Sequence, residues 1–239
     1  MLLTRRLLQL LLGLVLYGAA IALMVRASIG VAPWDVLTQG IVAQTGLGFG
    51  LVVFLTSAVV LLLWIPLRQR PRFGTVANAL LVGPFADLGL HVLPTQTVWW
   101  AQGLTFAAGL LLLAVASGLY IGADFGPGPR DGLMLGLHRR LGLRVGVART
   151  VIELTVLAVG WLLGGQVGIG TAVEALLIGP LVAVTLPLFA PRATRVAATS
   201  GPVADSAADS APGSAADSAP DSATGPTTGP VPTATSPTA

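Results

Sequence analysis

The sequence predicts an all-α membrane protein with six transmembrane helices arranged as two inverted three-helix repeats. Three observations predict this fold: the composition is apolar, six long segments carry almost no charge, and the first half of the chain recurs in the second. Of the 239 residues, 54% are hydrophobic and only 10% are charged, whereas a soluble domain carries about 25% charged residues. This composition excludes a water-soluble globular protein.

Six segments are long enough to cross the hydrocarbon core of a bilayer, which takes about 20 helical residues. They are residues 7–25, 47–67, 73–94, 98–121, 145–163 and 169–189. Arg5 and Arg6 precede the first segment, as basic residues precede the apolar part of a signal peptide. That segment is long and its pattern recurs in mid-chain, so we expect an uncleaved first helix.

The chain contains an internal repeat. At a shift of 96 positions, 24 of the 76 residues from Gly13 to Leu88 are identical to their partners, against about a tenth expected by chance. The informative identities are the Gly, Pro, Thr and Asp residues. Gly30, Pro33 and Asp35 match Gly126, Pro129 and Asp131; Gly46 and Gly50 match Gly142 and Gly146; Gly74, Thr75, Gly83 and Pro84 match Gly170, Thr171, Gly179 and Pro180. We therefore divide the chain into a first unit, residues 1–96, and a second unit, residues 97–195.

Residues 196–239 form a tail of different composition. The tail has no aromatic residue, Leu or Ile, so it cannot bury enough apolar surface to offset the entropy lost on ordering. The sequence predicts a disordered, cytoplasmic tail.

The arginines predict the orientation, because short cytoplasmic loops of membrane proteins are rich in basic residues. The basic groups follow the even-numbered spans and flank both ends of the membrane region: Arg5 and Arg6; Arg68, Arg70 and Arg72; Arg130, Arg139, Arg140 and Arg144; Arg192 and Arg195. Both termini are then cytoplasmic. The basic loop is the second loop of one unit and the first of the other, which is typical of inverted repeats. Arg26 alone falls on the outer side, where we expect Asp35 to neutralise it.

A Gly-x-x-Pro-x-Asp motif occurs at residues 30–35 and again at residues 126–131. Gly permits a turn, Pro suits the first position of a helix, and the Asp lies near the positive end of the helix dipole. The motif predicts short helices over residues 33–44 and 129–141. Each is either a plain helix start on a connecting or re-entrant segment, or one of a pair of helices that line a pathway. Asp35 and Asp131 are candidate pathway residues under the second interpretation.

Gly-Pro pairs occur inside two spans, at Gly83-Pro84 and Gly179-Pro180. Proline removes a backbone donor, so the pairs predict kinks near the middle of these helices. Interrupted helices at matching positions surround the substrate site in many inverted-repeat transporters. A simple packing kink is an equal alternative.

Four polar residues inside the spans are further candidates, because ionisable groups are costly in lipid. Asp87 is the strongest candidate for a substrate-contacting or coupling residue, with an outer-face pair to His91 as the alternative. Glu174 follows Thr171 at capping-box spacing, so it is expected to close the outer end of its helix. Its match in the first unit is Asn78, and the alternative is that the two are polar contacts at opposite ends of one pathway. Glu153 lies four residues after Arg149, as in a helical ion pair.

Other classes of function have little support in the sequence. The chain has no Cys and two His, and it contains no phosphate-binding loop, dinucleotide fingerprint, nucleophile elbow or metal-binding helix motif. We expect neither an enzyme nor a protein with a cofactor or metal, and we attribute the basic charge to membrane-flanking arginines rather than to nucleic-acid binding. Five tryptophans are expected to form an aromatic belt at the span ends: Trp34, Trp64, Trp99, Trp100 and Trp161.

Three stretches resemble the YczE/YyaS/YitT family of bacterial membrane proteins. They are GLYIGADFGPGPRDGLMLGL at residues 118–137, RASIGVAPWDVLTQG at 26–40 and GTAVEALLIGP at 170–180. The resemblance covers about residues 8–192. It implies an integral plasma-membrane protein of a group described as permeases or as proteins of unknown function, and it transfers no functional residue.

Together these observations predict a multi-pass protein of the bacterial plasma membrane that acts as a secondary transporter or permease of a small solute. The predicted partners are the lipid bilayer and that solute. The competing hypothesis is a membrane protein that does not transport but regulates or scaffolds a partner complex. Such a protein would tolerate the loss of Asp87 and Glu174 and would depend on its loops and its basic cytoplasmic face.

Overall fold

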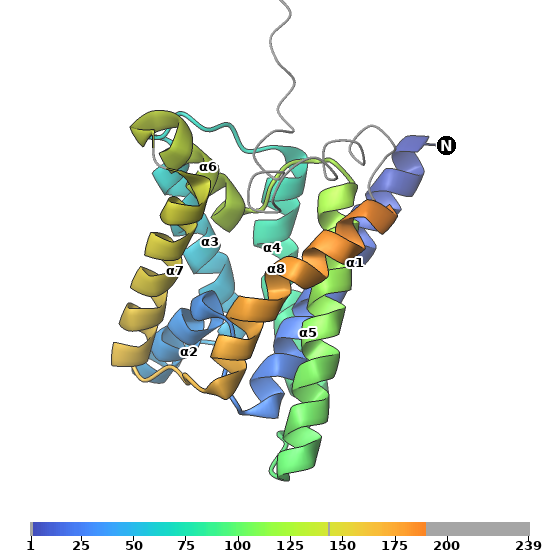
Figure 1. The fold of residues 1–239 in the computed structure, drawn as a ribbon, viewed down its shortest axis with the longest axis vertical. Coiled ribbons are helices and arrows are strands. Elements are labelled where there is room, and N and C mark those ends of the chain that lie inside the picture. Colours follow the sequence, from blue (N-terminus) through green and yellow to red (C-terminus); the bar gives the residue numbers. More distant parts are fainter. Residues whose placement is uncertain (1, 143, 190–239) are drawn as a thin grey trace, which may run out of the picture.

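The computed structural model describes residues 2–142 and 144–189, and every regular element in this part of the chain is an α-helix (Figure 1). The helices are α1 (Leu2–Ala27), α2 (Pro33–Thr45), α3 (Phe49–Trp64), α4 (Phe73–Val92), α5 (Trp99–Gly122), α6 (Pro129–Leu141), α7 (Val145–Leu162) and α8 (Ile169–Phe189). The tail predicted for residues 196–239 lies outside the described residues.

The helices confirm the predicted helical membrane protein. Within the described ranges, α1, α4, α5, α7 and α8 are each long and apolar enough to cross a membrane. α3 is shorter, and it makes a sixth span only together with α2, from which it is bent by 116°. The two short helices predicted after the Gly-x-x-Pro-x-Asp motifs are α2 and α6, so this prediction is also confirmed.

The sequence repeat is present in the backbone as well. Among the described residues, those with positive φ form four pairs, each 96 positions apart: Ser28 and Asp124, Gly30 and Gly126, Gly46 and Gly142, Arg68 and Gly164. The φ values of the first three pairs agree closely, at 59° and 60°, 116° and 112°, and 69° and 67°. The connecting segments of the two units therefore follow the same local path.

Several helices of one unit pack against helices of the other. The matched helices α1 and α5 lie side by side and run in opposite directions (Figure 1). α2 packs against α7 and, in the same way, α3 packs against α6. Small residues allow the close approach: a Cβ added at Gly13 would lie 2.8 Å from the backbone nitrogen of Tyr120.

Two matching hydrogen bonds link the units. The Gly74 N–H donates to the carbonyl of Phe125 at 3.0 Å, and the Gly170 N–H donates to the carbonyl of Ile29 at 2.8 Å. Each bond joins the start of one unit's last helix to the loop that follows the other unit's first helix. This exchange of partners brings the two loops, and the short helices that follow them, toward the middle of the molecule.

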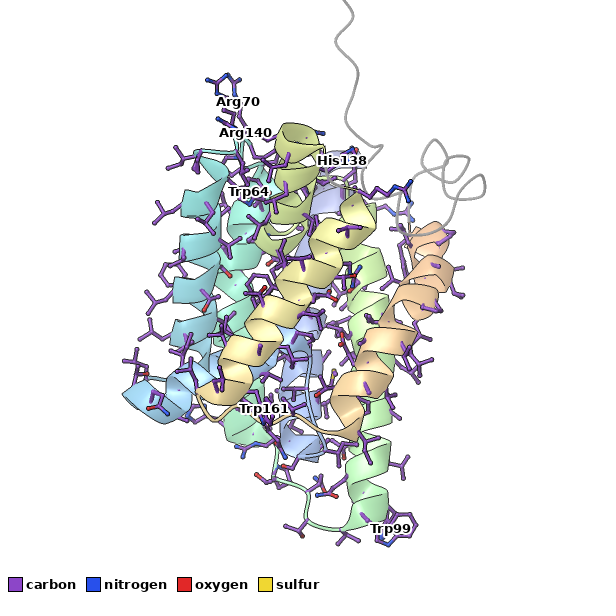
Figure 2. All side chains as sticks on the ribbon, turned by 60° about the vertical axis from the view of Figure 1, so that its left-hand side comes forward. Trp64, Arg70, Trp99, His138, Arg140 and Trp161 are labelled. Atoms are coloured by element: carbon purple, nitrogen blue, oxygen red, sulfur yellow. The ribbon has the colours of Figure 1, made fainter. Side chains whose placement is uncertain are left out.

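Basic residues gather at one end of the helix bundle. Figure 2 shows Arg70, His138 and Arg140 at one end of the molecule, and Trp99 at the opposite end. The N-terminus of α1 lies at the arginine-rich end (Figure 1). The basic loop after α3 and the basic end of α6 therefore share one side of the protein.

Candidate functional site at the first turns of α2 and α6

The site is built where α2 and α6 begin. Gly30 and Gly126 hold φ values of 116° and 112°, which favour glycine over residues with a side chain. Pro33 and Pro129 then occupy the first positions of the helices, and neither helix has a side-chain cap. The sequence motif thus produces two sharp turns followed by two helix starts.

Arg130 joins the two helix starts. Its Nη2 atom lies 3.8 Å from Oδ1 of Asp35, and its guanidinium carbon lies 5.0 Å from the ring centroid of Trp34. The Asp35 residue is only 2% exposed, and its Oδ1 has no hydrogen-bond partner within the described residues. Charge attraction at longer range, rather than a hydrogen bond, therefore pairs this buried carboxylate with Arg130.

The aspartate of the second motif, Asp131, directly follows Arg130 in the sequence and accepts a hydrogen bond from a tyrosine. The Tyr120 hydroxyl donates to Oδ2 of Asp131 at 2.7 Å. A Cβ added at Gly128 would lie 3.1 Å from the Tyr120 hydroxyl oxygen and 3.7 Å from Nδ2 of Asn78. Glycine at position 128 therefore leaves room for these polar groups to converge. We call Asp35, Asn78, Tyr120, Arg130 and Asp131 the polar centre.

A small cavity adjoins the polar centre. Its volume is about 40 Å³, and its lining consists of Tyr17, Val53, Ser57, Asn78, Val82, Tyr120, Gly128, Pro129, Arg130 and Asp131. This space holds about three water molecules. Its walls present guanidinium donors, a carboxylate acceptor, an amide and hydroxyl groups, so the cavity suits a small polar molecule or ion.

Three of the residues predicted from the sequence belong to the polar centre: Asn78 and Asp131 line the cavity, whereas Asp35 does not line it and pairs with Arg130. Glu174 lies outside the lining, on α8, where it is 7% exposed and within range of the charges of Asp35 and Glu153. Glu174 and Asn78 occupy matching positions in the two units. The Asn78 amide therefore lines the cavity, whereas the matching Glu174 carboxylate is buried on α8 outside the lining.

The capping-box interpretation of Glu174 is wrong. α8 begins at Ile169, and the Thr171 hydroxyl oxygen accepts a hydrogen bond from the Gly168 N–H at 3.3 Å. A box with Glu174 would require the helix to begin at Thr171, two residues later. The carboxylate of Glu174 is therefore inside the helix and does not close its end.

Glu153 forms the ion pair that its spacing predicts. Its Oε1 accepts from Nε of Arg149 at 2.9 Å on α7. The two side chains are 27% and 49% exposed, so the pair lies at the surface of the helix bundle and apart from the cavity.

Asp87 also lies apart from the cavity. Its Oδ1 accepts a hydrogen bond from the Gly50 N–H at 2.8 Å, in the first turn of α3. His91 contacts the main-chain oxygen of Asp87 at 2.8 Å through Nδ1. The carboxylate of Asp87 thus caps α3 from the neighbouring helix α4.

The Gly-Pro pairs lie within continuous helices. Pro84 and Pro180 are interior residues of α4 and α8, and both are exposed on the helix surface. Gly83 is buried against Gly50, whereas Gly179 has no described atom within 4 Å of an added Cβ. The two pairs therefore differ in their surroundings although their sequences match.

Two expectations about charge are corrected. Arg26 is not neutralised by Asp35; it donates to the Thr95 hydroxyl at 2.7 Å and to the carbonyl of Leu90. Arg130 is not a loop residue at the membrane surface; it is the second residue of α6 and lines the cavity. Both errors come from assigning charges by sequence position, because the partner of each arginine lies in another segment.

The aromatic-belt prediction is wrong for two of the five tryptophans. Trp34 and Trp64 are 6% and 2% exposed, whereas Trp99 and Trp161 are 81% and 66% exposed. The Trp64 indole N–H donates to the carbonyl of Pro129 at 3.1 Å. Trp34 and Trp64 therefore pack against the start of α6 instead of facing the membrane interface.

Sequence reasoning missed Arg130, Tyr120 and Ser57 as site residues. Arg130 had a usable signal, because it stands between Pro129 and Asp131 in the repeated motif. Tyr120 matches Met24 and Ser57 matches Glu153 in the other unit. The match to the candidate Glu153 was therefore a usable signal for Ser57, whereas the repeat contained none for Tyr120.

Comparison with known proteins places the chain among bacterial proteins without an assigned activity. It is 37% identical over 181 residues to an uncharacterized protein of Haemophilus influenzae, an alignment that covers 76% of this chain and 83% of the relative. It is 29% identical over 177 residues to the uncharacterized membrane protein YczE of Bacillus subtilis, covering 73% and 82%. It is 26% identical over 181 residues to the uncharacterized protein YyaS of the same organism, covering 74% and 90%.

The likeness to YczE and YyaS confirms the resemblance found in the sequence. No solved structure matches the chain. Residues 4–187 match DUF6198, a family of unknown function, and this match covers most of the chain. The chain is therefore a multi-pass helical membrane protein that belongs to the DUF6198 family.

Proposed function

We propose that this protein is a secondary transporter or permease of a small polar solute in the bacterial plasma membrane, and that the polar centre is its solute site. The proposal rests mainly on one observation: the cavity beside the first turn of α6 is lined by both Arg130 and Asp131. Ionisable side chains inside membrane helices are costly and commonly mark solute or ion pathways. No enzymatic reaction is part of this proposal.

The lining of the cavity combines hydrogen-bond donors with hydrogen-bond acceptors. Arg130 carries five N–H donors and no acceptor, whereas the Asp131 carboxylate accepts hydrogen bonds only. Asn78 and Ser57 offer both kinds of group. A solute that carries a donor and an acceptor group, such as a small zwitterion or a hydrated ion, would satisfy this lining.

The arrangement of the two units also supports transport. α1 and α5 run in opposite directions (Figure 1), the positive-φ residues match at a spacing of 96, and the short helices begin next to each other at the centre. We propose that the units are inverted repeats related by an axis in the membrane plane, with the solute site near that axis. We place both termini and the arginine-rich end in the cytoplasm.

The test is a thermal-shift screen of the purified full-length protein. The panel consists of alkali and ammonium cations, halides, phosphate, amino acids and short carboxylic acids. A bound solute raises the melting temperature by mass action. We expect a solute that stabilises the wild type but not Asp131→Asn or Arg130→Gln.

The matched control is Asp124→Asn, which removes an exposed carboxylate paired with Arg6 at 2.7 Å and leaves the cavity intact. It should keep the response to the solute. The stabilising solute is then offered to proteoliposomes. Uptake would support transport, whereas binding without uptake would favour the alternative, a membrane protein that regulates a partner complex.

A further inference from the structure

The two units differ at one pair of matching helix contacts. In the first unit α3 packs along α4, whereas in the second unit α7 and α8 stand apart in both views (Figures 1 and 2). A Cβ added at Gly50 or Gly83 would overlap the carbonyl oxygen of the other glycine. The matching residues, Gly146 and Gly179, have no described atom within 4 Å of an added Cβ. The two glycines therefore touch in the first unit, where we call Gly50 and Gly83 the closed pair. Their matches do not touch in the second unit, where we call Gly146 and Gly179 the open pair.

The open pair lacks a packing reason in this conformation. Glycine inside a helix costs about 0.5–1 kcal/mol relative to alanine, and at Gly146 and Gly179 there is room for the additional methyl group. In the first unit the same two positions require glycine, because the backbones touch. A second conformation in which α7 and α8 also touch would explain the glycines of the open pair.

The closed pair has an additional restraint that the open pair lacks. Asp87 on α4 accepts a hydrogen bond from Gly50 in the first turn of α3, where a negative charge is favoured by the helix dipole. The residue that matches Asp87 in the second unit is Ala183. This difference favours closure of the α3–α4 contact over closure of the α7–α8 contact.

We infer that the protein alternates between two conformations, in which the α3–α4 contact and the α7–α8 contact close in turn. The α3–α4 pair contributes Asn78 of α4 and Ser57 of α3 to the lining of the cavity, and Asn78 is matched on α8 by the buried Glu174. Closure of α7 against α8 brings Gly146 onto Gly179 and releases Gly50 from Gly83. This inference rests on the proposed transport function and specifies the movement that exposes the site alternately.

The test measures both contacts in one protein. The chain has no Cys, so spin labels can be attached to introduced cysteines at two matching pairs of exposed positions, Leu55 with Leu80 and Val151 with Leu176. Pulsed electron paramagnetic resonance then gives the α3–α4 distance and the α7–α8 distance in lipid nanodiscs. We expect the wild type to favour a short α3–α4 and a long α7–α8 distance.

Three substitutions change the balance in stated directions. Asp87→Ala adds no atoms and removes the hydrogen bond to Gly50, so the fraction with a short α7–α8 distance and a long α3–α4 distance should rise on the order of tenfold. Gly50→Ala should act in the same direction by steric overlap. Adding Gly179→Ala to Asp87→Ala should abolish the short α7–α8 distance, because its methyl group occupies the space that α7 must enter.

The control is Gly103→Ala, a helical glycine of α5 that likewise has no described atom within 4 Å of an added Cβ. It should change neither distance. A lengthened α3–α4 distance in Asp87→Ala with an unchanged α7–α8 distance would overturn the inference. If Gly50→Ala does not fold, Asp87→Ala decides the question alone. Reciprocal distances without solute uptake would refute the transport function and retain the movement.

Discussion

At the scale of single residues, the ion pair between Asp35 and Arg130 joins the starts of α2 and α6. Burial of a carboxylate in a membrane protein is costly unless an opposite charge compensates it. The Asp35 side chain is 3% exposed and that of Arg130 is 23% exposed, so only Arg130 retains access to the cavity. The pair therefore stabilises a buried charge and at the same time holds a guanidinium at the wall of the cavity.

Arg130→Gln should lower the free energy of unfolding by about 3 kcal/mol, because it leaves the Asp35 carboxylate buried without its charge partner. The double variant Asp35→Asn/Arg130→Gln should recover most of this loss, since neither charge remains. The measurement is a double-mutant cycle of unfolding in detergent. Additive effects of the two substitutions would show that the charges are not coupled.

At the scale of elements, the short helices α2 and α6 depend on how they end. The residue after each helix, Gly46 or Gly142, adopts the left-handed conformation, with φ of 69° and 67°. The Gly46 N–H donates to the Val42 carbonyl at 2.8 Å, and the Gly142 N–H donates to the His138 carbonyl at 3.0 Å. These caps satisfy carbonyls at the helix ends and turn the chain sharply toward α3 and α7.

Gly46→Ala should destabilise the protein by about 1 kcal/mol, because alanine is strained in the left-handed conformation. A Cβ at this position meets no described atom within 4 Å, so the cost is conformational rather than steric. Gly46→Asn should cost less, since asparagine tolerates this conformation better. Thermal unfolding of the three proteins in detergent tests the order Gly, Asn, Ala; equal stability of the Asn and Ala variants would contradict it.

At the scale of the whole molecule, the two ends of the helix bundle differ, because basic residues gather at one of them. Arg70, His138 and Arg140 lie at one end and Trp99 at the other (Figure 2). A basic end facing the cytoplasm agrees with the loop rule for membrane proteins. It would place the segment between α4 and α5 and the segment between α7 and α8 on the outer side.

Single cysteines introduced into the Cys-free chain test this orientation. Thr97→Cys and Gln166→Cys, at exposed positions of these two segments, should react with a membrane-impermeant maleimide in intact cells. Arg70→Cys, also exposed, should react only after the cells are permeabilised. Labelling of residue 70 in intact cells together with protection of residue 166 would reverse the proposed orientation.

Much of the fold could be predicted because it depends on local or periodic signals. Long apolar segments predict helices that cross a membrane, and the Gly-x-x-Pro-x-Asp motif predicts the start of α2 and of α6. The candidate site was predictable in part: Asp35, Asp131 and Asn78 were named, whereas the role of Arg130 was not. Its partners Asp35 and Trp34 lie on another helix of the other unit, so no local pattern connects them.

The sequence by itself determined that the chain is helical, duplicated and suited to a membrane, since composition, hydrophobic length and repeated Gly and Pro residues act within each segment. The tertiary structure alone decided which polar groups meet. It buries Trp34 and Trp64 at the start of α6 and turns Asp87 into a cap for α3. It also closes Gly50 on Gly83 while leaving Gly146 and Gly179 apart. These outcomes depend on the packing of helices that are distant in the sequence, and identical motifs in the two units can therefore have different neighbours.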